Sequence, residues 1–144
     1  MLVPMTLHRI IISEILEQQT IDLVEKDGDR KLRIFIGIFE ATSIERRVRK
    51  APRPRPLTHD LLVNMVQSLG GELDSILIDS LENRTYFAKI RVRIGGSTVD
   101  VDARPSDAIA VAVTCQPTLP IWVEESLIED SLDEEEDTEG SDDD

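Results

Sequence analysis

The chain has little of what marks a secreted, disulfide-bonded or membrane-spanning protein. Cys115 is its single cysteine, so no disulfide can form within the chain. No apolar run approaches the length of about 18 residues that suits a membrane-spanning helix. The first residues, MLVPMTLHRIII, show neither the basic start nor the cleavage site of a signal peptide. We therefore expect a soluble, cytoplasmic protein.

The chain also lacks the short motifs that identify common catalytic and metal-binding sites. It contains no CxxC pair, no HExxH helix, no phosphate-binding Walker loop and no GxSxG nucleophile turn. Histidine is scarce as well, with two in the chain. A functional site must therefore be sought in less specific groups of polar residues.

Negative charge is concentrated at one end of the chain. The formal net charge is −13, but residues 124–144 hold 13 acidic and no basic side chains, whereas residues 1–123 hold 16 of each sign. A segment with so much charge and so little apolar surface does not build a core. We expect one domain at residues 1–128, which is long enough to bury a core without disulfides, and a disordered acidic tail at residues 129–144.

Two hairpins are predicted from their turns and from the side chains on either side. Asp27-Gly28 and Gly95-Gly96 are both strong turn signals. Folding the chain at each turn sets apolar side chains opposite apolar ones and acidic opposite basic ones, as the two faces of a sheet require. The expected pairs are Leu23 with Leu32, Ile21 with Ile34, Asp22 with Arg33, Glu25 with Arg30, Val92 with Val99, Ile90 with Val101, Ala88 with Ala103, Arg91 with Asp100, and Lys89 with Asp102.

The other segments complete an α+β fold with the order βββααβββαβ, a mixed and largely antiparallel sheet with about three helices. Residues 58–69 carry apolar side chains on one face and end at Gly70-Gly71. Residues 106–115 are apolar all round, which predicts a helix buried on more than one side. Further strands are expected at 5–12, 73–81 and 119–124, and a first helix at 41–50.

A faint internal repeat accompanies this order. Residues 36–48 and 101–113 align at an offset of 65, and each reads as strand, short turn and helix. Either an internal duplication or the general likeness of strand-to-helix junctions explains the repeat.

Two polar segments at expected helix entrances are the main candidates for a site, Arg55-Pro-Leu-Thr-His-Asp60 and Asp102-Ala-Arg-Pro-Ser-Asp107. Helix N-termini attract anions, and arginine binds phosphate or carboxylate through two hydrogen bonds. Part of the pattern also suits structure, because Thr58 and Ser106 are good N-caps and acids suit first turns. Structure does not explain the shared Arg-Pro, so we expect the two entrances to meet in one pocket.

Several of these side chains could take part in catalysis. His59 is a candidate general base near neutral pH, although a lone histidine at a helix start is more often a surface or hydrogen-bonded residue. Asp102 could bind a metal ion or could simply pair with Lys89. The carboxylates that could together hold a divalent metal ion are Asp102, Asp107, Glu40 and Asp60.

A cluster of basic residues at 46–55 is the strongest phosphate-binding signal in the chain. Its alternative is a solvated helix face. The acidic tail, on a flexible tether, could occupy this cluster as a mimic of a polyanion, or could only aid solubility. The basic cluster comprises Arg46, Arg47, Arg49, Lys50, Arg53 and Arg55.

The two polar segments also carry a family resemblance. RPLTHDLL at 55–62 and DARPSDAIAVAV at 102–113 resemble the two signature stretches of the bifunctional nuclease domain family. FIGIFEATSI at 35–44 and the segment at 69–92 are similar to that family in layout, so the resemblance covers roughly residues 5–128. It implies a small α+β protein that acts on RNA and DNA and could self-associate as a dimer. The basic helix after Glu40 departs from the Ala- and Leu-rich helix expected of the family.

Our leading hypothesis is a nuclease in which these residues have separate roles. Arg55 and Arg104 would bind phosphate, His59 would move a proton, and Asp102 with Asp107 would hold a metal ion or orient the site. The alternative is a non-catalytic binding module that uses the same entrances for a small anionic ligand or a protein carboxylate. The candidates for catalysis are His59, Asp60, Asp102 and Asp107, those for substrate binding are Arg55, Thr58, Arg104, Ser106, Arg46, Arg47 and Arg49, and those for a metal ion are Glu40, Asp102 and Asp107.

Overall fold

Seven strands and three helices of ten or more residues follow one another in the predicted order, and a short helix at residues 125–128 follows the last strand. The structure, a computed structural model, describes residues 1–13, 15 and 18–128, so the expected acidic tail lies outside the described residues. None of the helices in these ranges is both long and apolar enough to cross a membrane. The elements are β1 (Leu2–Ile11), β2 (Gln18–Glu25), β3 (Lys31–Gly37), α1 (Ile38–Val48), α2 (Thr58–Ser68), β4 (Glu72–Glu82), β5 (Thr85–Ile94), β6 (Ser97–Ala103), α3 (Pro105–Thr114) and β7 (Ile121–Glu124).

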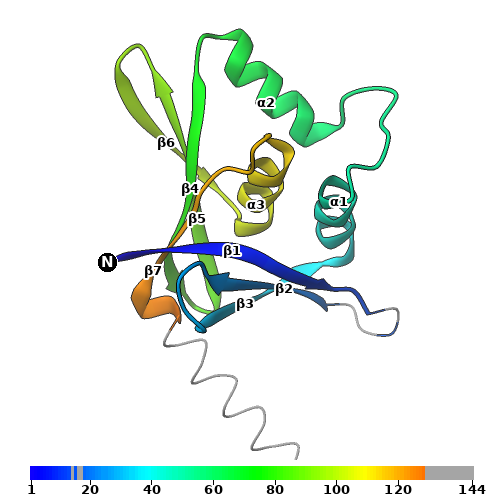
Figure 1. Ribbon diagram of the computed structural model, residues 1–144, viewed down its shortest axis with the longest axis vertical. Helices are drawn as coiled ribbons and strands as arrows, with labels where there is room; N and C mark the ends of the chain where they lie inside the picture. Colours follow the sequence, from blue (N-terminus) through cyan, green and yellow to red (C-terminus); the bar gives the residue numbers. More distant parts are fainter. Residues whose placement is uncertain (14, 16–17, 129–144) are drawn as a thin grey trace, which may run out of the picture.

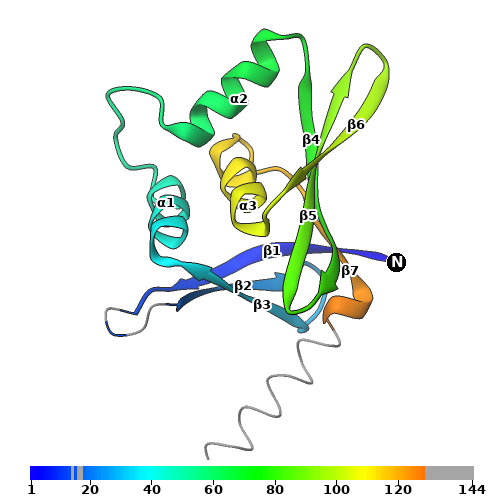
Figure 2. The same cartoon turned by 180° about the vertical axis from the view of Figure 1, so that it is seen from behind.

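The strands form one mixed sheet in the order β3-β2-β1-β7-β4-β5-β6. All neighbouring strands are antiparallel except β4 and β7, which run parallel. The last strand therefore joins two three-stranded halves. Figures 1 and 2 show these halves at a wide angle to each other, with α1 and α3 between them and α2 beyond the end of α1. The predicted α+β class and the mainly antiparallel sheet are confirmed.

Each half of the sheet has the same plan. Three consecutive strands, β1 to β3 and β4 to β6, lead directly into α1 and α3, and the two sets extend outward from β7 in opposite directions. α1 and α3 pack against each other, so the halves also meet through their helices. This arrangement is what an internal duplication would leave, with α2 and β7 added outside the repeat.

Both hairpins have the predicted register, and one predicted ion pair is replaced by another. Arg91 pairs with Asp100 at 2.9 Å as expected. Lys89 lies opposite Asp102, but its ammonium group donates to Asp79 of β4 at 2.8 Å. Because β5 lies between β4 and β6, its basic side chains have carboxylates on both sides. The sequence of the β5–β6 hairpin alone could not show that Asp79 of β4 competes with Asp102 for Lys89.

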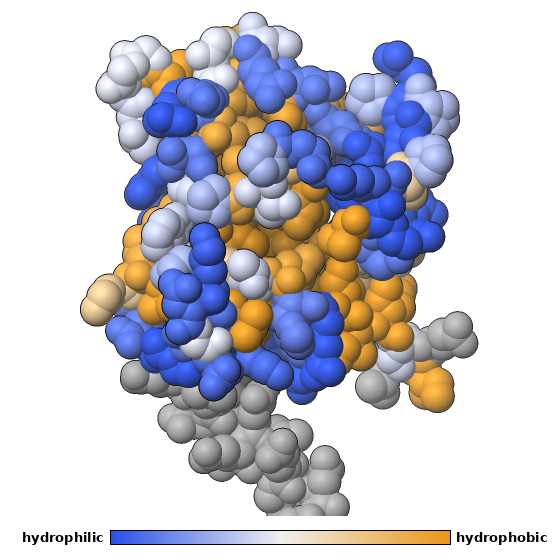
Figure 3. Space-filling model, in the orientation of Figure 1, coloured by the Kyte–Doolittle hydropathy of each residue, from blue (hydrophilic) through white to orange (hydrophobic). Residues whose placement is uncertain are grey.

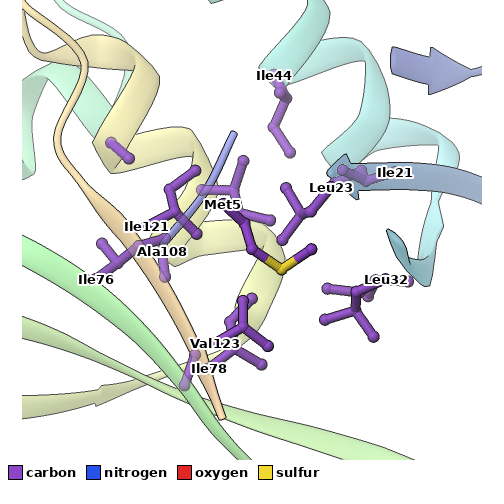
Figure 4. Packing of buried hydrophobic residues seen from close by; sticks show 14 of the residues in the cluster. Met5, Ile21, Leu23, Leu32, Ile44, Ile76, Ile78, Ala108, Ile121 and Val123 are labelled. Carbon is purple, nitrogen blue, oxygen red and sulfur yellow. The ribbon is translucent and has the colours of Figure 1, made fainter. Parts of the chain in front are cut away.

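The core lies between the sheet and the two helices α1 and α3. Figure 4 shows Met5 near the middle of this cluster, between Leu23 and Leu32 from one half of the sheet and side chains from the other half. α3 is buried on more than one side as predicted, because α1, α2 and both β4 and β5 pack against it. Full burial stabilises each large apolar side chain by roughly 1.5–3 kcal/mol.

α2 buries a different side from the one its apolar residues mark. Its buried residues are Asp60 and Val63. The helix packs on α3 and β4 along one narrow side, because it lies at the end of the molecule. Its apolar stripe is therefore left exposed, at Leu61 (53%), Leu62 (43%), Met65 (51%) and Leu69 (74%).

Candidate functional site

Asp107 joins the two predicted helix entrances. One of its carboxylate oxygens lies 3.0 Å from Nε2 of His59, in the first turn of α2, and the other accepts a hydrogen bond from Nε of Arg104 at 2.9 Å. His59 and Asp107 are 48 positions apart in the chain. The two segments therefore meet, as expected, at a carboxylate in the first turn of α3. The expected common pocket is not found, because residues 104–106 line one of the described cavities and residues 55–57 line another.

Arg104 connects this pair to a third helix entrance. Its Nη1 donates to Oε1 of Glu40, in the first turn of α1, at 3.3 Å. Gly37 makes room for the Glu40 carboxylate, because a Cβ at position 37 would overlap with Oε2 of Glu40. We call the set His59, Asp107, Arg104 and Glu40 the four-residue network.

The hydrogen bonds fix the charge of Asp107. Burial alone would raise the pKa of this carboxyl group, but hydrogen bonds from Arg104 and His59 outweigh burial and hold the pKa below its ordinary value. The pKa of Arg104 is raised, first by its hydrogen bond to Asp107 and then by Glu40. Because an ionised carboxylate only accepts hydrogen bonds, we assign the proton in the contact with Asp107 to Nε2 of His59.

The other ring nitrogen of His59 is enclosed. Nδ1 is buried and has no hydrogen-bond partner among the described residues, and the side chain is 13% exposed. With the proton on Nε2, Nδ1 is the nitrogen that can accept a proton. It can do so only after the first turn of α2 shifts or the ring turns over.

A cavity of about 350 Å³ opens beside Arg104 and Glu40. The same cavity is lined by Arg84, in the turn before β5, and by Tyr86, at the start of β5. Neither residue was predicted as part of a site. The sequence signal that could have found Arg84 is the dipeptide Asn83-Arg84, because glycine would usually follow the asparagine in such a turn. In the structure both residues have left-handed φ angles, of 50° and 65°. An arginine held in a glycine conformation points to a role beyond the turn itself.

Two predicted N-caps are wrong, because the N-cap of each helix lies one or two residues earlier in the chain. Leu57 is the N-cap of α2, and the Asp60 carboxylate accepts a hydrogen bond from its backbone N–H at 2.9 Å, so Thr58 is the first helical residue. Arg104 is the N-cap of α3, because Pro105 fits the first helical position, and Ser106 is buried within the first turn.

Asp102 and Asp60 lie outside the four-residue network. Asp102 is exposed and points to the opposite face of β6 from Ala103, beside Asp100. Asp60 pairs with Arg53 at 2.9 Å in addition to its contact with Leu57, so it stabilises the entrance of α2.

The predicted metal ligands do not form a ligand set. The described residues contain no group of three or more histidine, cysteine, aspartate or glutamate side chains placed to hold a metal ion. Glu40 and Asp107 are held together by the guanidinium group of Arg104, and Asp102 points away from them. These residues do not fit a divalent metal ion held by protein side chains alone, because a cation already bridges the two carboxylates.

The basic cluster at 46–55 is not one solvated face. Arg49 forms an ion pair with Glu45. Arg47 is 3% exposed, and its Nη1 donates to the backbone oxygen and hydroxyl of Ser43 at 2.9 and 2.6 Å. The predicted phosphate ligand Arg55 lines a separate cavity formed by Arg46, Arg47 and residues 51–57, so it does not join Arg104.

Comparisons with a family model and with known proteins point to one family of similar proteins. The family model described as "Bifunctional nuclease domain" matches residues 21–136. An uncharacterized protein of Mycobacterium tuberculosis (strain CDC 1551 / Oshkosh) is 38% identical over 125 residues, which cover 82% of this chain and 73% of that protein. The protein named Bifunctional nuclease 2 of Oryza sativa subsp. japonica is 31% identical over 121 residues, 81% of this chain and 36% of the rice protein. Bifunctional nuclease 1 of Arabidopsis thaliana is 33% identical over 76 residues, 51% of this chain and 23% of that protein.

Proposed function

Because this chain belongs to the bifunctional nuclease domain family, we propose that it is a nuclease that hydrolyses phosphodiester bonds of RNA, DNA or both. The observation that supports this proposal best is that His59 and Arg104 bind the same carboxylate, that of Asp107. A group that can transfer a proton thus lies beside one that can bind phosphate, which is the combination that phosphodiester hydrolysis needs.

In this proposal the cavity beside the network holds the reacting phosphate. The Arg104 side chain is 64% exposed, so its donors that Asp107 and Glu40 leave free face a ligand in the cavity. Arg84 lines the same cavity and adds a second guanidinium group. Arginine binds phosphate oxygens through paired hydrogen bonds and stabilises the negative charge that builds up as the bond to the leaving oxygen breaks.

His59 would activate the attacking water. Its Nδ1 takes a proton from the water, the water oxygen forms a bond to phosphorus, and the bond between phosphorus and the leaving oxygen breaks. The leaving oxygen then receives a proton, from solvent or from the imidazolium. Asp107 holds the imidazole in one tautomer and stabilises the imidazolium that forms. Because Nδ1 is buried and His59 does not line the cavity, the proposal requires the first turn of α2 to move toward the cavity when substrate binds.

The burial of Nδ1 also supports a second candidate function. Without that movement His59 cannot exchange a proton with a bound molecule, whereas Arg84 and Arg104 can bind an anion as they stand. The protein would then be a non-catalytic binding module for a small anionic ligand or a protein carboxylate.

A cleavage assay with matched histidine variants distinguishes the two functions. End-labelled single-stranded RNA and DNA are incubated with wild type, His59→Gln and His8→Gln, all purified identically. His8 is an exposed residue of β1 outside the network and is the only other histidine. If the protein is a nuclease, we expect cleavage by wild type and His8→Gln, and a cleavage rate about a hundredfold or more lower in His59→Gln. Equal cleavage by all three preparations would identify a contaminant and reject the proposal.

A parallel series with EDTA tests the requirement for metal. The described residues offer no complete ligand set, so a metal requirement would mean that the substrate phosphate supplies ligands. Abolition of cleavage by EDTA and its recovery with excess Mg²⁺ or Mn²⁺ would establish that requirement.

A further inference from the structure

Arg47 is a buried cation that has no ion pair with a carboxylate in the part of the chain that the structure describes. It projects from the last turns of α1, is 3% exposed, and its hydrogen bonds go to the backbone and hydroxyl oxygens of Ser43. Its Nε is buried and has no hydrogen-bond partner among the described residues. A buried guanidinium group that lacks an anionic partner is costly, so its presence calls for an explanation.

The nearest carboxylate does not neutralise the region. Asp60 acts on Arg47 only at a distance, and its Oδ2 already forms an ion pair with Arg53 and accepts a hydrogen bond from the backbone of Leu57. Lys50 adds another positive charge, and the structure shows no ion pair for it within the described ranges. One carboxylate therefore faces three cations, which leaves an excess of positive charge.

These cations surround a cavity. A space of about 270 Å³ between the ends of α1 and α3 is lined by Arg47, Lys50, Arg53, Thr114 and Gln116, which together offer charged and neutral hydrogen-bonding groups. Both α1 and α3 end here, and helix C-termini disfavour anions. The full positive charges of three side chains in and around the cavity outweigh the partial negative charges at the two helix C-termini.

A larger groove extends from the same residues. It has a volume of about 960 Å³, shares Arg47, Lys50 and Gln116 with the smaller cavity, and continues over apolar residues that include Val48 and Leu119. Figure 3 shows hydrophobic surface in a hollow at the centre of this face, bordered by hydrophilic residues over the connection between α1 and α2. The cationic end and the apolar extension together suit a molecule that has an anionic head and a larger body.

We propose that the cavity around Arg47 is a second anion-binding site, separate from the four-residue network, which binds a phosphate group carried on a larger and partly apolar body. A free nucleotide and the 5′-phosphate end of a nucleic acid both have this chemistry. The site does not depend on the proposed nuclease activity, because none of its lining residues belongs to the network.

Binding measurements with phosphate-bearing probes test this site. Isothermal titration of the full chain at low salt uses inorganic phosphate, adenosine 5′-monophosphate, and a short oligonucleotide with a 5′-phosphate or a 5′-hydroxyl. We expect the 5′-phosphate to strengthen oligonucleotide binding about tenfold or more over the 5′-hydroxyl. Tighter binding of the nucleotide would identify a free nucleotide as the ligand, and tighter binding of the oligonucleotide would identify a nucleic-acid end.

Two variants and a control locate the binding. Lys50 has a left-handed φ of 56°, which asparagine tolerates, so Lys50→Asn removes the charge without backbone strain. We expect this variant, and Arg47→Gln where it remains folded, to weaken every phosphate-bearing probe about tenfold. Arg49→Gln removes a charge next to Lys50 that does not line the cavity, and it should leave binding unchanged. Unchanged affinity in Lys50→Asn, or equal affinity for the 5′-phosphate and 5′-hydroxyl oligonucleotides, would overturn the proposal.

Discussion

At the scale of single residues, the site depends on one carboxylate that serves two partners. Asp107 accepts hydrogen bonds from His59 and from Arg104, so it orients a potential base and a potential phosphate ligand together. The segment that contains it was recognisable from sequence as a polar helix entrance. His59 and Arg104 were candidates from the sequence as well, but their hydrogen bonds to Asp107 could not be predicted, because His59 is brought to Asp107 only when α2 packs against α3.

Replacing Asp107 by asparagine should reduce stability in a pH-dependent way. The folded-state pKa of Asp107 is depressed, so its stabilising contribution is present above the pKa of the unfolded chain, about 4, and is lost as pH falls through the folded-state pKa. We expect Asp107→Asn to lower the free energy of unfolding by about 1 kcal/mol at pH 7, a small value because a third of the side chain is exposed. Urea denaturation at pH 7, 5 and 3 measures this difference.

Asp102→Asn is the matched control for that experiment. Asp102 is exposed on the opposite face of β6, and we expect its replacement to change stability little at any of the three pH values. A deficit in Asp107→Asn that is the same at pH 3 and pH 7 would show that the ionised carboxylate is not what the structure needs.

At the scale of elements, local sequence patterns predicted the hairpins and helices, which depend on residues that are close together in the chain. Turn residues and alternating side chains set both hairpins, and apolar periodicity set the helices to within a few residues. Contacts between distant segments could not be read in this way. Lys89 pairs with Asp79 on a strand outside its hairpin. The burial of Arg47 was likewise not predicted for the basic cluster, because the α1–α2 connection and α3, which enclose it, are distant from it or irregular in sequence.

The β4–β5 turn should become more stable, and the site weaker, when Arg84 is replaced by glycine. Arg84 holds a φ of 65°, which costs a residue with a Cβ roughly 1 kcal/mol and glycine almost nothing. We therefore expect Arg84→Gly to raise the free energy of unfolding by about that amount. Because Arg84 lines the cavity beside Arg104, the same variant should bind single-stranded oligonucleotides about tenfold more weakly.

Asn83→Gly provides the comparison for Arg84. It changes the neighbouring left-handed residue of the same turn but removes no charge, and it does not line the cavity. Its oligonucleotide affinity should equal that of wild type. If Arg84→Gly also retains full affinity, Arg84 takes no part in binding.

The entrance of α1 offers a substitution that moves one carboxylate. A Cβ at Gly37 would overlap with Oε2 of Glu40, and the end of that flexible side chain can swing away with little loss of stability. We expect Gly37→Ala to break the contact between Glu40 and Arg104 and to reduce cleavage severalfold at a nearly unchanged melting temperature. Gly28→Ala would displace the Glu25 carboxylate in the β2–β3 turn in the same way, and its cleavage rate should match that of wild type.

At the scale of the whole molecule, charge is divided between a neutral body and an acidic C-terminal segment. Residues 124–144 carry 13 of the 29 acidic side chains, and the described body contains the cation-lined cavity around Arg47.

We also propose that the protein self-associates, and the exposed apolar stripe of α2 is the surface most suited to it. Sedimentation velocity of wild type and Met65→Lys tests that proposal.

Deleting residues 130–144 should strengthen the binding of nucleic acid at low salt. The deletion removes most of the uncompensated negative charge, which repels polyanions and can compete for the basic cluster. The gain should vanish near molar salt, where screening removes it. Affinity measured by fluorescence anisotropy across a salt series checks this, with a Gly/Ser segment of equal length as the control. Unchanged affinity at low salt would leave the tail a role in solubility alone.

The most direct test of the account is to measure cleavage and binding of one labelled oligonucleotide in the same preparation, with enzyme in excess over substrate. The account predicts that His59→Gln lowers the single-turnover cleavage rate by about a hundredfold or more, while the dissociation constant changes by less than about threefold. This result would show that His59 moves a proton and does not merely support the cavity. Binding without any cleavage by the wild-type protein would contradict the central claim and establish the binding module instead.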